Sequence, residues 1–491
     1  MPLNSPSPHI RPSQSADKPG IAANKAAWGD FRNHIATADR DGSRKWVYPT
    51  KPRGRYYRAR QWLTWVMLLV MFGGPFVKIQ GNPLLMINIV ERRFSVLGVI
   101  FWPQDNLIFA LGFLLFLTGI AIFTAAFGRL WCGWTCPQTV LMEMVFRRIE
   151  YAIEGDASAQ KALNRAPLSG TKILKKGSKH LIFAILSFVI GNVLLAYIIG
   201  WDSLKLIITD GPLQHTTGLG FMFLFSLVFY GIFARFREQA CTFICPYGRF
   251  QSTLLDENSI VVAYDHKRGE HRGRARRHEP WGQRRTHGMG DCIDCFRCVT
   301  VCPTGIDIRN GTQMECVACT ACIDACDEVM DKMKHPRGLI RYASLNGIEK
   351  GEKLRVTPRL MVYCGLLVTL GLGLTVLLMT RSDMDASFLR NPGSLFQQAA
   401  EGRISNIYQL KLTNKTHSSK RVELKLEGIE GVISILGEDL LVPAEQQVEV
   451  PVIVEIAPGK LQSGSTPLQV AIYVDGKRGQ LVKTGFIGPR K

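Results

Sequence analysis

The sequence predicts a multi-domain integral membrane protein, with an α-helical membrane domain of about five spans, a cysteine-rich domain and a C-terminal all-β sandwich. Three observations predict this architecture. Long apolar runs without charge recur along the 491 residues, which excludes a simple soluble globule. Twelve of the 13 cysteines fall in short groups and residues 382–491 contain none, which does not fit an extracellular disulfide scaffold. The C-terminal part alternates apolar and polar side chains.

Five charge-free segments could cross a bilayer. They comprise residues 62–77, 107–127, 181–199, 218–234 and 360–379. A further apolar stretch, residues 84–101, is interrupted by Glu91, Arg92 and Arg93, so we expect an interfacial segment or loop there. Residues 1–60 begin with a Pro- and Ser-rich stretch and hold no apolar run. We therefore expect a basic flexible arm and no cleavable signal peptide.

Loop charges predict the orientation of these spans. Residues 1–60 hold 12 Lys and Arg and residues 128–180 hold nine, whereas residues 200–217 hold only Lys205. Because cytoplasmic loops are enriched in Lys and Arg, both rich segments should be cytoplasmic. With five spans, residues 235–359 are cytoplasmic as well, and the C-terminal domain lies on the outer, periplasmic face of the cytoplasmic (inner) membrane.

The net charge of +20 belongs almost entirely to the chain before residue 382, because residues 382–491 hold 13 Lys and Arg against 12 Asp and Glu. Its densest part is KRGEHRGRARRHEPWGQRRTH, residues 267–287, with eight Lys and Arg against Glu270 and Glu279. This stretch could bind nucleic acid. A solvated linker near anionic lipid headgroups explains it without a new partner, so we expect contact with membrane lipid and none with nucleic acid.

The densest group of cysteines lies between residues 292 and 326. The sequence there reads DCIDCFRCVTVCPTG and, after a spacer, ECVACTACIDACD. Two consecutive CxxCxxCxxxC runs have the ligand spacing of a bacterial two-cluster ferredoxin, in which the fourth cysteine of each run binds the other run's cluster. One 4Fe-4S cluster is therefore assigned to Cys292, Cys295, Cys298 and Cys326. The second 4Fe-4S cluster is assigned to Cys302, Cys316, Cys319 and Cys322.

Zinc sites also use CxxC pairs. Zinc needs only four ligands per site and gives no reason for the third cysteine at the same step or for the Cys-Pro that ends the first run. Two clusters side by side would form a relay for single electrons. One departure from the ferredoxin pattern is Asp327, which stands where proline would follow Cys326.

A second cysteine repeat follows the second and fourth predicted spans. The segments GRLWCGWTCPQTV and ARFREQACTFICPYG each place a basic residue and then CxxxCP after a span. The residue before a proline disfavours helix, whereas proline is tolerated at the first helical position. Cys136 and Cys245 are therefore expected to cap the next helix, where the positive helix end favours thiolate. Cys132 and Cys241 would lie across a tight turn from them.

Each of these cysteine pairs could chelate one soft ion, and a close pair of thiolates matches the low coordination number of Cu(I). Reducible disulfides, one further four-cysteine cluster built from both repeats, and simple packing are alternatives. Two copies beside an electron relay favour redox or metal function over packing. The candidate catalytic and copper-binding residues are therefore Cys132, Cys136, Cys241 and Cys245.

The C-terminal region predicts short strands. Period-two alternation covers residues 408–412, 422–426, 448–456 and 468–474, with turn signals at 458–459 and 475–476. We expect a small antiparallel sandwich of about 100 residues that acts as a docking module. The predicted domains are a basic arm (1–60), a membrane domain with four spans (61–250), a basic linker (251–290), a ferredoxin-like domain (291–345), a linker with the fifth span (346–382) and the sandwich (383–491).

Several of these features together resemble the CcoG family of cytochrome oxidase accessory proteins, also called FixG or RdxA. The match is strongest over GDCIDCFRCVTVCPTGIDIRNGTQMECVACTACIDACDEVMDKMKHPRGLIRYASLNG, with support from both CxxxCP copies and from NIYQLKLTNKT, and it extends from about residue 40 to the last residue. The resemblance implies a membrane-bound iron-sulfur protein of bacteria with an immunoglobulin-like C-terminal domain. It also implies a role in assembling cbb-type oxidases and in reducing Cu(II) to Cu(I).

Three functions follow from this resemblance and from the residues. In the first, a cytoplasmic electron donor loads the clusters, Cu(II) is reduced at the CxxxCP thiolates, and Cu(I) passes to cbb-type oxidase subunits or copper-delivery proteins. In the second, the chain is an electron conduit between the quinone pool and a redox partner without copper, because its CxxxCP-bearing core also resembles NapH-type carriers. In the third, it is a non-catalytic assembly scaffold.

Overall fold

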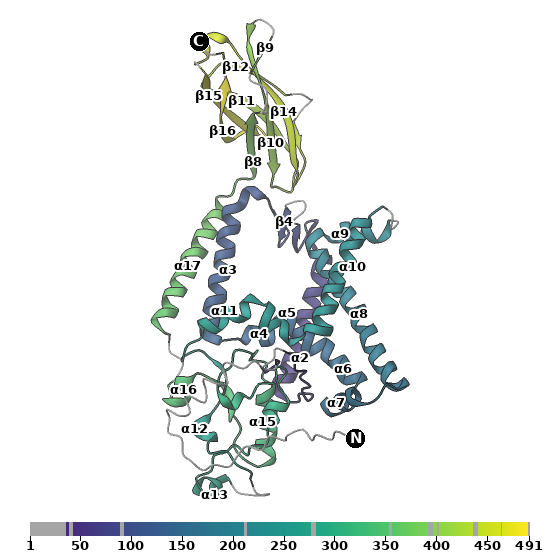
Figure 1. Cartoon of the computed structure of the whole chain (residues 1–491). Coiled ribbons are helices and arrows are strands. Elements are labelled where there is room, and N and C mark those ends of the chain that lie inside the picture. The colour runs from purple at the N-terminus through teal and green to yellow at the C-terminus, as the bar shows by residue number, and fades with distance from the viewer. Residues whose placement is uncertain are drawn as a thin grey trace. The chain divides into compact units, whose positions relative to one another are not determined.

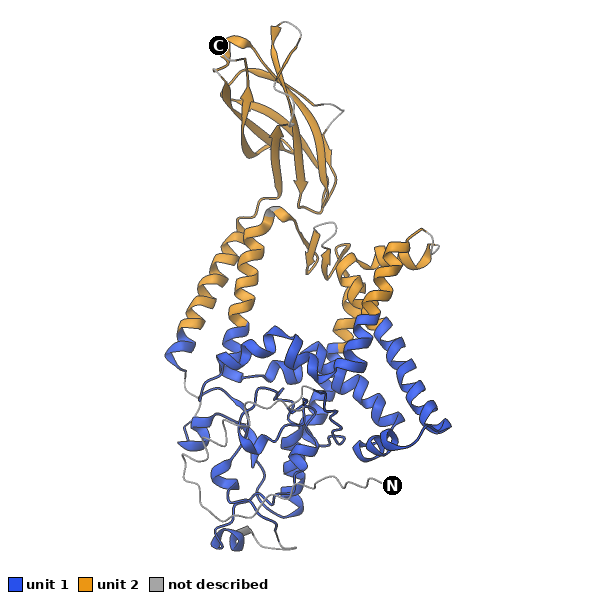
Figure 2. Cartoon of the chain, viewed as in Figure 1, with its two compact units in different colours: residues 1–67, 120–188, 227–361 blue, residues 68–119, 189–226, 362–491 orange. Residues whose placement is uncertain are grey.

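Figure 1 shows the computed structural model of the chain. The structure describes residues 36–38, 43–88, 93–210, 214–275, 281–352, 356–390, 396–399, 402–435, 440–462 and 464–489. The chain divides into two compact units, which Figure 2 colours separately. Unit 1 comprises residues 1–67, 120–188 and 227–361, and unit 2 comprises residues 68–119, 189–226 and 362–491.

Within the described residues, four helices are long and apolar enough to cross a membrane. They are α3 (Asn106–Phe127), α8 (Gly170–Ile199), α10 (Thr216–Gly231, continued by a π-helix to Phe236) and α17 (Pro358–Met379). Side chains along α17 are not buried within the chain, as expected of a helix that faces lipid. These helices confirm four of the five predicted spans, and the chain is a multi-pass membrane protein.

The first predicted span, residues 62–77, is not among these four helices. Its residues fall in α2 (Arg55–Gly73) and in the 3₁₀ turn η1 (Gly74–Phe76) that follows. Helix α2 begins with Arg55, Arg58 and Arg60, so the helix as a whole is less apolar than the stretch after residue 62. Pro75 follows its C-terminal glycines and cannot continue the helix. The structure thus supports four spans, and the orientation derived from five stays a prediction.

Unit 1 holds both cysteine-bearing regions. The first CxxxCP motif lies in α4 (Leu130–Trp134) and before α5 (Pro137–Val140), which leads into the π-helix η3 (Leu141–Phe146), α6 (Arg147–Ile153) and α7 (Ala157–Arg165). The second lies in the π-helix η5 (Ala240–Ile244), which follows the π-helix η4 (Ile232–Phe236), and before helix α11 (Pro246–Leu254). The cysteine-rich domain consists of β6 (Val261–Tyr264), α12 (His266–Gly269), α13 (Trp281–Thr286), α14 (Arg297–Thr300), η6 (Ile308–Asn310), α15 (Ala321–Lys332), β7 (Ile340–Ala343) and α16 (Leu345–Glu349), with β6 and β7 paired antiparallel.

Two stretches expected to be flexible are packed where the structure describes them. In the basic arm, residues 43–60 contact the cysteine-rich domain: the Thr50 N–H donates to the Thr300 carbonyl over 2.9 Å. Asp324 accepts the N–H groups of Tyr56 and Tyr57 over 3.1 and 2.8 Å and so caps the start of α2. In the predicted basic linker (251–290), the described residues contain β6, α12 and α13, and the Gly273 N–H donates to the Cys292 carbonyl. Neither segment could be placed from local sequence, because the partners lie far away along the chain.

Unit 2 contains the predicted sandwich of two antiparallel sheets. One sheet has the order β12 (Gly431–Ile435), β14 (Gln447–Ile456), β10 (Ile404–Asn414) and β8 (Met384–Arg390), with β9 (Gln397–Gln398) paired to β10. The other has the order β13 (Leu441–Val442), β11 (Lys420–Glu427), β15 (Ser465–Val474) and β16 (Lys477–Ile487). The alternating residues Tyr408, Leu410 and Leu412 are fully buried in its core. All four predicted strand runs are confirmed, in β10, β11, β14 and β15.

The expected interfacial stretch, residues 84–101, forms a small antiparallel sheet. Its strands are β3 (Leu85–Asn88), β4 (Arg93–Val96) and β5 (Val99–Phe101). Strands β1 (Lys78–Ile79) and β2 (Asn82–Pro83) pair just before it, and α9 (Trp201–Thr209) belongs to the same unit. Glu91 and Arg92 lie outside the described residues.

Candidate metal centres

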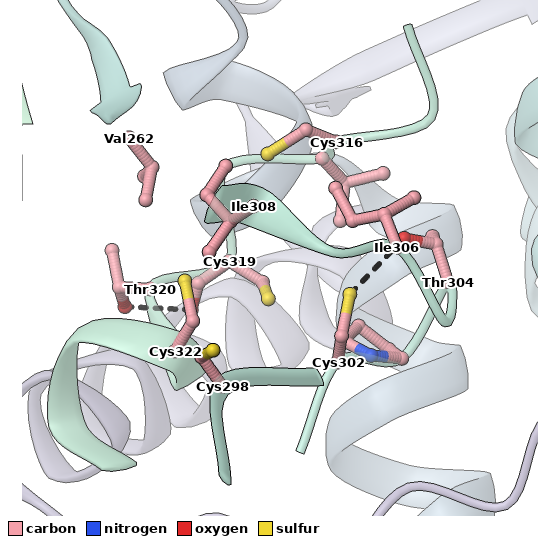
Figure 3. A pocket seen from close by; sticks show the side chains of 12 residues that line it. Val262, Cys298, Cys302, Thr304, Ile306, Ile308, Cys316, Cys319, Thr320 and Cys322 are labelled. Carbon is pink, nitrogen blue, oxygen red and sulfur yellow. Dashed lines mark hydrogen bonds between the residues drawn. The ribbon is translucent and has the colours of Figure 1, made fainter. Parts of the chain in front are cut away.

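The two cysteine runs bring their eight thiols into two adjacent groups. One cavity, drawn in Figure 3, is lined by Cys302, Cys316, Cys319 and Cys322. A second cavity is lined by Cys292, Cys295, Cys298 and Cys326. Cys298 lines both cavities, so the groups adjoin. The fourth cysteine of each run lies with the other run's group, which is the crossed arrangement that the spacing predicts.

Burial and mutual repulsion act on these thiols together. Burial raises the pKa of Cys319 to about 12. The pKa of Cys326 is raised first by burial and then by the charges that Cys298, Cys292 and Cys295 would carry. Four thiolates are therefore stable in one group only when a cation replaces their protons. Two sets of four thiols, all but Cys295 buried or half-buried, line apolar cavities that fit two 4Fe-4S clusters, and these residues would hold them.

The two runs fold through the same turn. In the first run, Asp294 and Phe296 have φ values of 54° and 55°; in the second run, Ala318 and Thr320 have φ values of 53° and 64°. A left-handed backbone at a residue with a side chain is uncommon, and here it flanks the second cysteine of each run. Phe296 then precedes α14 and Thr320 precedes α15, and these helices carry the third cysteine of each run.

The CxxxCP cysteines occupy the helix starts that the sequence predicts. Cys136 has an extended backbone and precedes α5, with Pro137 at its first position. Cys245 is also extended and precedes α11, with Pro246 at its first position. The missing N–H of each proline falls where a helix has no partner for it, so each motif ends in a fixed turn.

The two CxxxCP motifs are joined by a hydrogen-bonded network. The Cys132 thiol donates to the Gln251 side-chain oxygen, with the sulfur and oxygen 3.2 Å apart, and Gln251 belongs to the helix that follows the second motif. Arg129 Nε donates to the same oxygen over 2.8 Å, and its Nη2 donates to the Gly248 carbonyl. The two repeats thus form one site, although 109 residues separate Cys132 from Cys241 along the chain.

Electrostatics likewise place all four CxxxCP thiols in one neighbourhood. The pKa of Cys241 is raised to about 12, first by burial and then by the charges that Cys136, Cys132 and Cys245 would carry. The pKa of Cys132 is raised to about 11, again mainly by burial, while Arg129 opposes the shift. Cys132 and Cys241 therefore hold their protons at neutral pH and release them when a metal binds.

Buried ion pairs hold the segments that carry the two motifs together. Arg147, after the first motif, is 2% exposed and pairs with Glu143 and with Glu238, which lies just before the second motif. Arg237 pairs with Glu150 over 2.7 Å. Removing one partner of a buried pair leaves an uncompensated charge, so these pairs constrain how the two motifs face each other.

The first CxxxCP motif packs directly on the second cysteine run. A Cβ atom added to Gly133 would lie 2.5 Å from the carbonyl oxygens of Val317 and Ala318, so only glycine permits this approach. Arg60 bridges the two segments, donating to the Gly133 carbonyl and to the Cys319 carbonyl over 2.9 Å each. The contact joins the residue after Cys132 to the turn around Cys319.

Apolar packing continues this contact on both motifs. Cys132 packs against a buried cluster made up of Val301, Val317, Cys319, Ala321 and Ala325. Cys241 lines a cavity together with Pro303, Thr304 and Val317 of the cysteine-rich domain. Thr304 is hydrogen-bonded to the Cys302 sulfur at 3.3 Å. Both CxxxCP motifs therefore adjoin the group of Cys302, Cys316, Cys319 and Cys322.

Within the described part of the chain, no three His, Cys, Asp or Glu side chains converge tightly enough to hold a single metal ion. This applies to the eight ferredoxin-type thiols as well as to the four CxxxCP thiols. The geometry therefore leaves both interpretations of the CxxxCP site open, a copper site and a further iron-sulfur cluster.

Sequence reasoning identified the cysteines but not the residues that connect them. Arg60 belongs to the stretch expected to be a flexible arm, and Gly133 had no role. Sequence reasoning gave no role to Gln251 or Thr304 either. Arg129 carried a usable signal, because a basic residue precedes CxxxCP in both copies. The others contact residues more than 70 positions away or pair with a sulfur, and spacing alone does not indicate either.

Comparisons with known families match three parts of the chain. Residues 236–345 match a 4Fe-4S dicluster domain, residues 109–153 match a 4Fe-4S binding domain, and residues 374–489 match the IG-like fold at the C-terminal of FixG. The nitrogen fixation protein FixG of Rhizobium meliloti is 34% identical over 431 residues, covering 79% of this chain and 80% of that protein. Protein RdxA of Cereibacter sphaeroides is 36% identical over 408 residues, covering 79% of this chain and 83% of that protein. Protein RdxB of the same organism is 34% identical over 399 residues, covering 77% and 81%.

Proposed function

This chain belongs to the FixG/RdxA family of iron-sulfur proteins, and on that premise we propose that it transfers electrons to Cu(II) at its CxxxCP motifs. Cys132, Cys136, Cys241 and Cys245 bind the copper substrate, and one electron converts Cu(II) to Cu(I). The product serves the assembly of a cbb-type cytochrome c oxidase. Oxidase subunits or copper-delivery proteins receive it.

The observation that carries this proposal is the contact between the Cys132 loop and the Cys319 loop. Gly133 lies against the carbonyls of Val317 and Ala318, and Arg60 bonds to both loops. Electron transfer becomes slow as the distance between donor and acceptor grows. A glycine contact and one bridging arginine keep the two sets of thiols as close as the backbone allows.

The protein's own residues prepare the site for this step. When bound, a 4Fe-4S cluster takes up and gives single electrons. Cys132 and Cys241 are half-buried, which raises the pKa of both thiols, and Arg129 favours the thiolate form of Cys132. Thiolates favour Cu(I) over Cu(II), so binding by these sulfurs draws copper towards its reduced state. Gln251 accepts the Cys132 thiol hydrogen until the metal replaces it.

A second function is favoured by one finding. Residues 109–153, which include the first CxxxCP motif, match a 4Fe-4S binding domain. If the four CxxxCP thiols hold a further cluster, the chain is an electron conduit between the quinone pool and a redox partner, and copper has no place in it.

Changing Cys132, Cys136, Cys241 and Cys245 to serine tests the proposal. We expect the purified variant to keep the iron and sulfide of the intact protein and to lose both copper binding and Cu(II) reduction, followed with a Cu(I)-specific chelator. Undiminished reduction would remove the role of these thiols. A fall of one cluster's iron and sulfide per chain, with no copper bound by the intact protein, would instead establish the conduit.

The orientation and the partners of the chain belong to the same proposal. The positive-inside rule supports a cytoplasmic ferredoxin-like domain and a periplasmic sandwich, which docks the assembling oxidase. Thiol labelling of intact cells tests the orientation, since reaction of Cys132 or Cys245 from the periplasm would contradict it. Removing residues 385–491 is expected to abolish oxidase assembly while Cu(II) reduction by the membranes persists.

A further inference from the structure

The turn around Cys295 is open to solvent, unlike the other cysteine positions of the ferredoxin-like domain. Among the eight thiols of the two runs, all of which the structure describes, Cys295 alone is exposed. The next residue, Phe296, is 47% exposed. Thr320, which occupies the same place in the second run, is 1% exposed. The open turn therefore presents an aromatic ring beside a candidate metal ligand.

Arginine side chains surround this turn. The Arg309 guanidinium lies over the Phe296 ring, 4.1 Å from its centre, and pairs with Asp307 and Asp294. The Arg297 side chain is 47% exposed and pairs with Glu328 at 3.4 Å. The three carboxylates Asp294, Asp307 and Glu328 are thus paired with arginine.

The most basic stretch of the chain packs on this same group of thiols. The Cys292 carbonyl accepts the Gly273 N–H over 3.2 Å and the Arg284 side chain over 3.0 Å. The side chain of Arg285 is 48% exposed. The described residues of this stretch, 267–275 and 281–287, carry six Lys and Arg against Glu270, so positive charge gathers beside this group of thiols.

We propose that Cys295, Phe296, Arg297 and Arg285 form the docking surface of an acidic, soluble one-electron carrier protein. The inference rests on the proposed function and names the class of the electron donor. In each encounter the carrier is oxidised by one electron, and the iron-sulfur centre held by Cys295 and its partners is reduced by that electron. No covalent bond forms or breaks. The group around Cys319 cannot serve this role, because Arg60 and Gly133 cover it.

A lipid surface is a weaker explanation of the same charges. Anionic headgroups would attract the arginines, but they give no reason for exposing a candidate metal ligand beside them. An acidic protein partner uses both features, because complementary charge speeds the encounter and the exposed thiol shortens the distance for the electron.

The test compares two matched charge reversals in the full-length protein. Arg297→Glu breaks an exposed Arg–Glu pair on the docking surface, and Arg478→Glu breaks an exposed Arg–Glu pair in the sandwich, where Arg478 and Glu427 are 2.7 Å apart. The probe is plant-type 2Fe-2S ferredoxin, an acidic carrier, and its affinity is measured by calorimetry. We expect Arg297→Glu to raise the dissociation constant about tenfold, or ~1.4 kcal/mol. Arg478→Glu should leave it unchanged, and added salt should weaken binding by the intact protein.

Iron and sulfide content shows whether each variant keeps its clusters, and Arg285→Glu replaces Arg297→Glu if that variant loses them. Equal ferredoxin affinity for the intact protein and both surface variants would overturn the inference. So would lost binding to phosphatidylserine vesicles with unchanged ferredoxin affinity, since the surface would then serve lipid.

Dithionite, which reduces the clusters without docking, separates this inference from the proposed function. If dithionite drives Cu(II) reduction in a chain that binds no ferredoxin, the docking surface is contradicted and the proposed copper reductase is not. If Arg297→Glu weakens ferredoxin binding but dithionite drives no Cu(II) reduction, the docking surface is supported and the proposed copper reductase is contradicted.

Discussion

The turn around Cys295 and the turn around Cys319 have the same backbone but different surroundings. Each places left-handed residues on both sides of its cysteine. At Cys319, Arg60 of α2 and Gly133 of α4 cover the turn. At Cys295 no comparable cover is present in the described residues, and the thiol is exposed. The spacing of a repeated motif therefore determines how its thiols converge, whereas segments far away in sequence determine which copy can meet a partner.

This difference gives the two thiol groups of the ferredoxin-like domain separate roles in one electron-transfer path. The group that contains Cys319 is the covered half, and the group that contains Cys295 is the open half. The covered half adjoins the CxxxCP thiols, so it faces the site where we propose that copper is reduced. The open half faces solvent beside positive charge, so it suits a soluble carrier. Cys298 lines the cavities of both halves and connects them. Changes that affect only one half test whether the division is real.

The largest expected effect separates the two halves by their cysteines. Cys319→Ser should remove one whole cluster and destabilise the domain, because its buried site has no water to replace the lost sulfur. Cys295→Ser should keep most of its cluster, since the serine oxygen or water can reach the exposed position. Iron and sulfide analysis of the purified variants measures both. Equal losses would show that exposure does not distinguish the two positions.

Arg60 provides the next effect, on the cover of the second half. Arg60→Met leaves two buried carbonyls, those of Gly133 and Cys319, without their donor. At about 1–3 kcal/mol for each of the two unsatisfied groups, we expect the free energy of unfolding to fall by roughly 2–6 kcal/mol. Arg60→Lys, which can reach one carbonyl, should recover part of that loss. Thermal unfolding followed by cluster absorbance is the measurement, and no difference between Met and Lys would contradict the bridging role.

Gly133 is expected to have a smaller effect. Gly133→Ala places a methyl group against two backbone carbonyls that cannot move aside cheaply, at a cost of about 1–3 kcal/mol. Cu(II) reduction driven by dithionite should slow because the CxxxCP loop moves away from the second cysteine run. Gly282→Ala is the matched control, since a methyl group there meets no atom within 4 Å. If the two variants behave alike, the close approach at Gly133 has no role.

The sequence was sufficient for features that depend on spacing between near neighbours. The crossed grouping of thiols, the helix starts at Cys136 and Cys245 and the buried alternation of β10 follow from periods of two to four residues. It was insufficient where distant segments meet. Arg60 was assigned to a flexible arm and residues 62–77 to a separate span, because nothing local indicates that α2 begins at Arg55 and contacts Asp324.

The smallest expected effect concerns a single hydrogen bond to sulfur in the covered half. The hydroxyl of Thr304 lies 3.3 Å from the Cys302 sulfur, and a donor there stabilises the more negative, reduced state of a bound cluster. Thr304→Val should therefore lower the reduction potential of that cluster. If the bond contributes ~0.5–1 kcal/mol to the difference between the states, the shift is roughly 20–40 mV for one electron. Redox titration followed by electron paramagnetic resonance measures it.

Thr300→Val is the control, because the Thr300 hydroxyl donates to the Arg297 carbonyl instead of a sulfur. An unchanged or raised potential in Thr304→Val would mean that burial, and not this hydroxyl, distinguishes the covered centre from the open one.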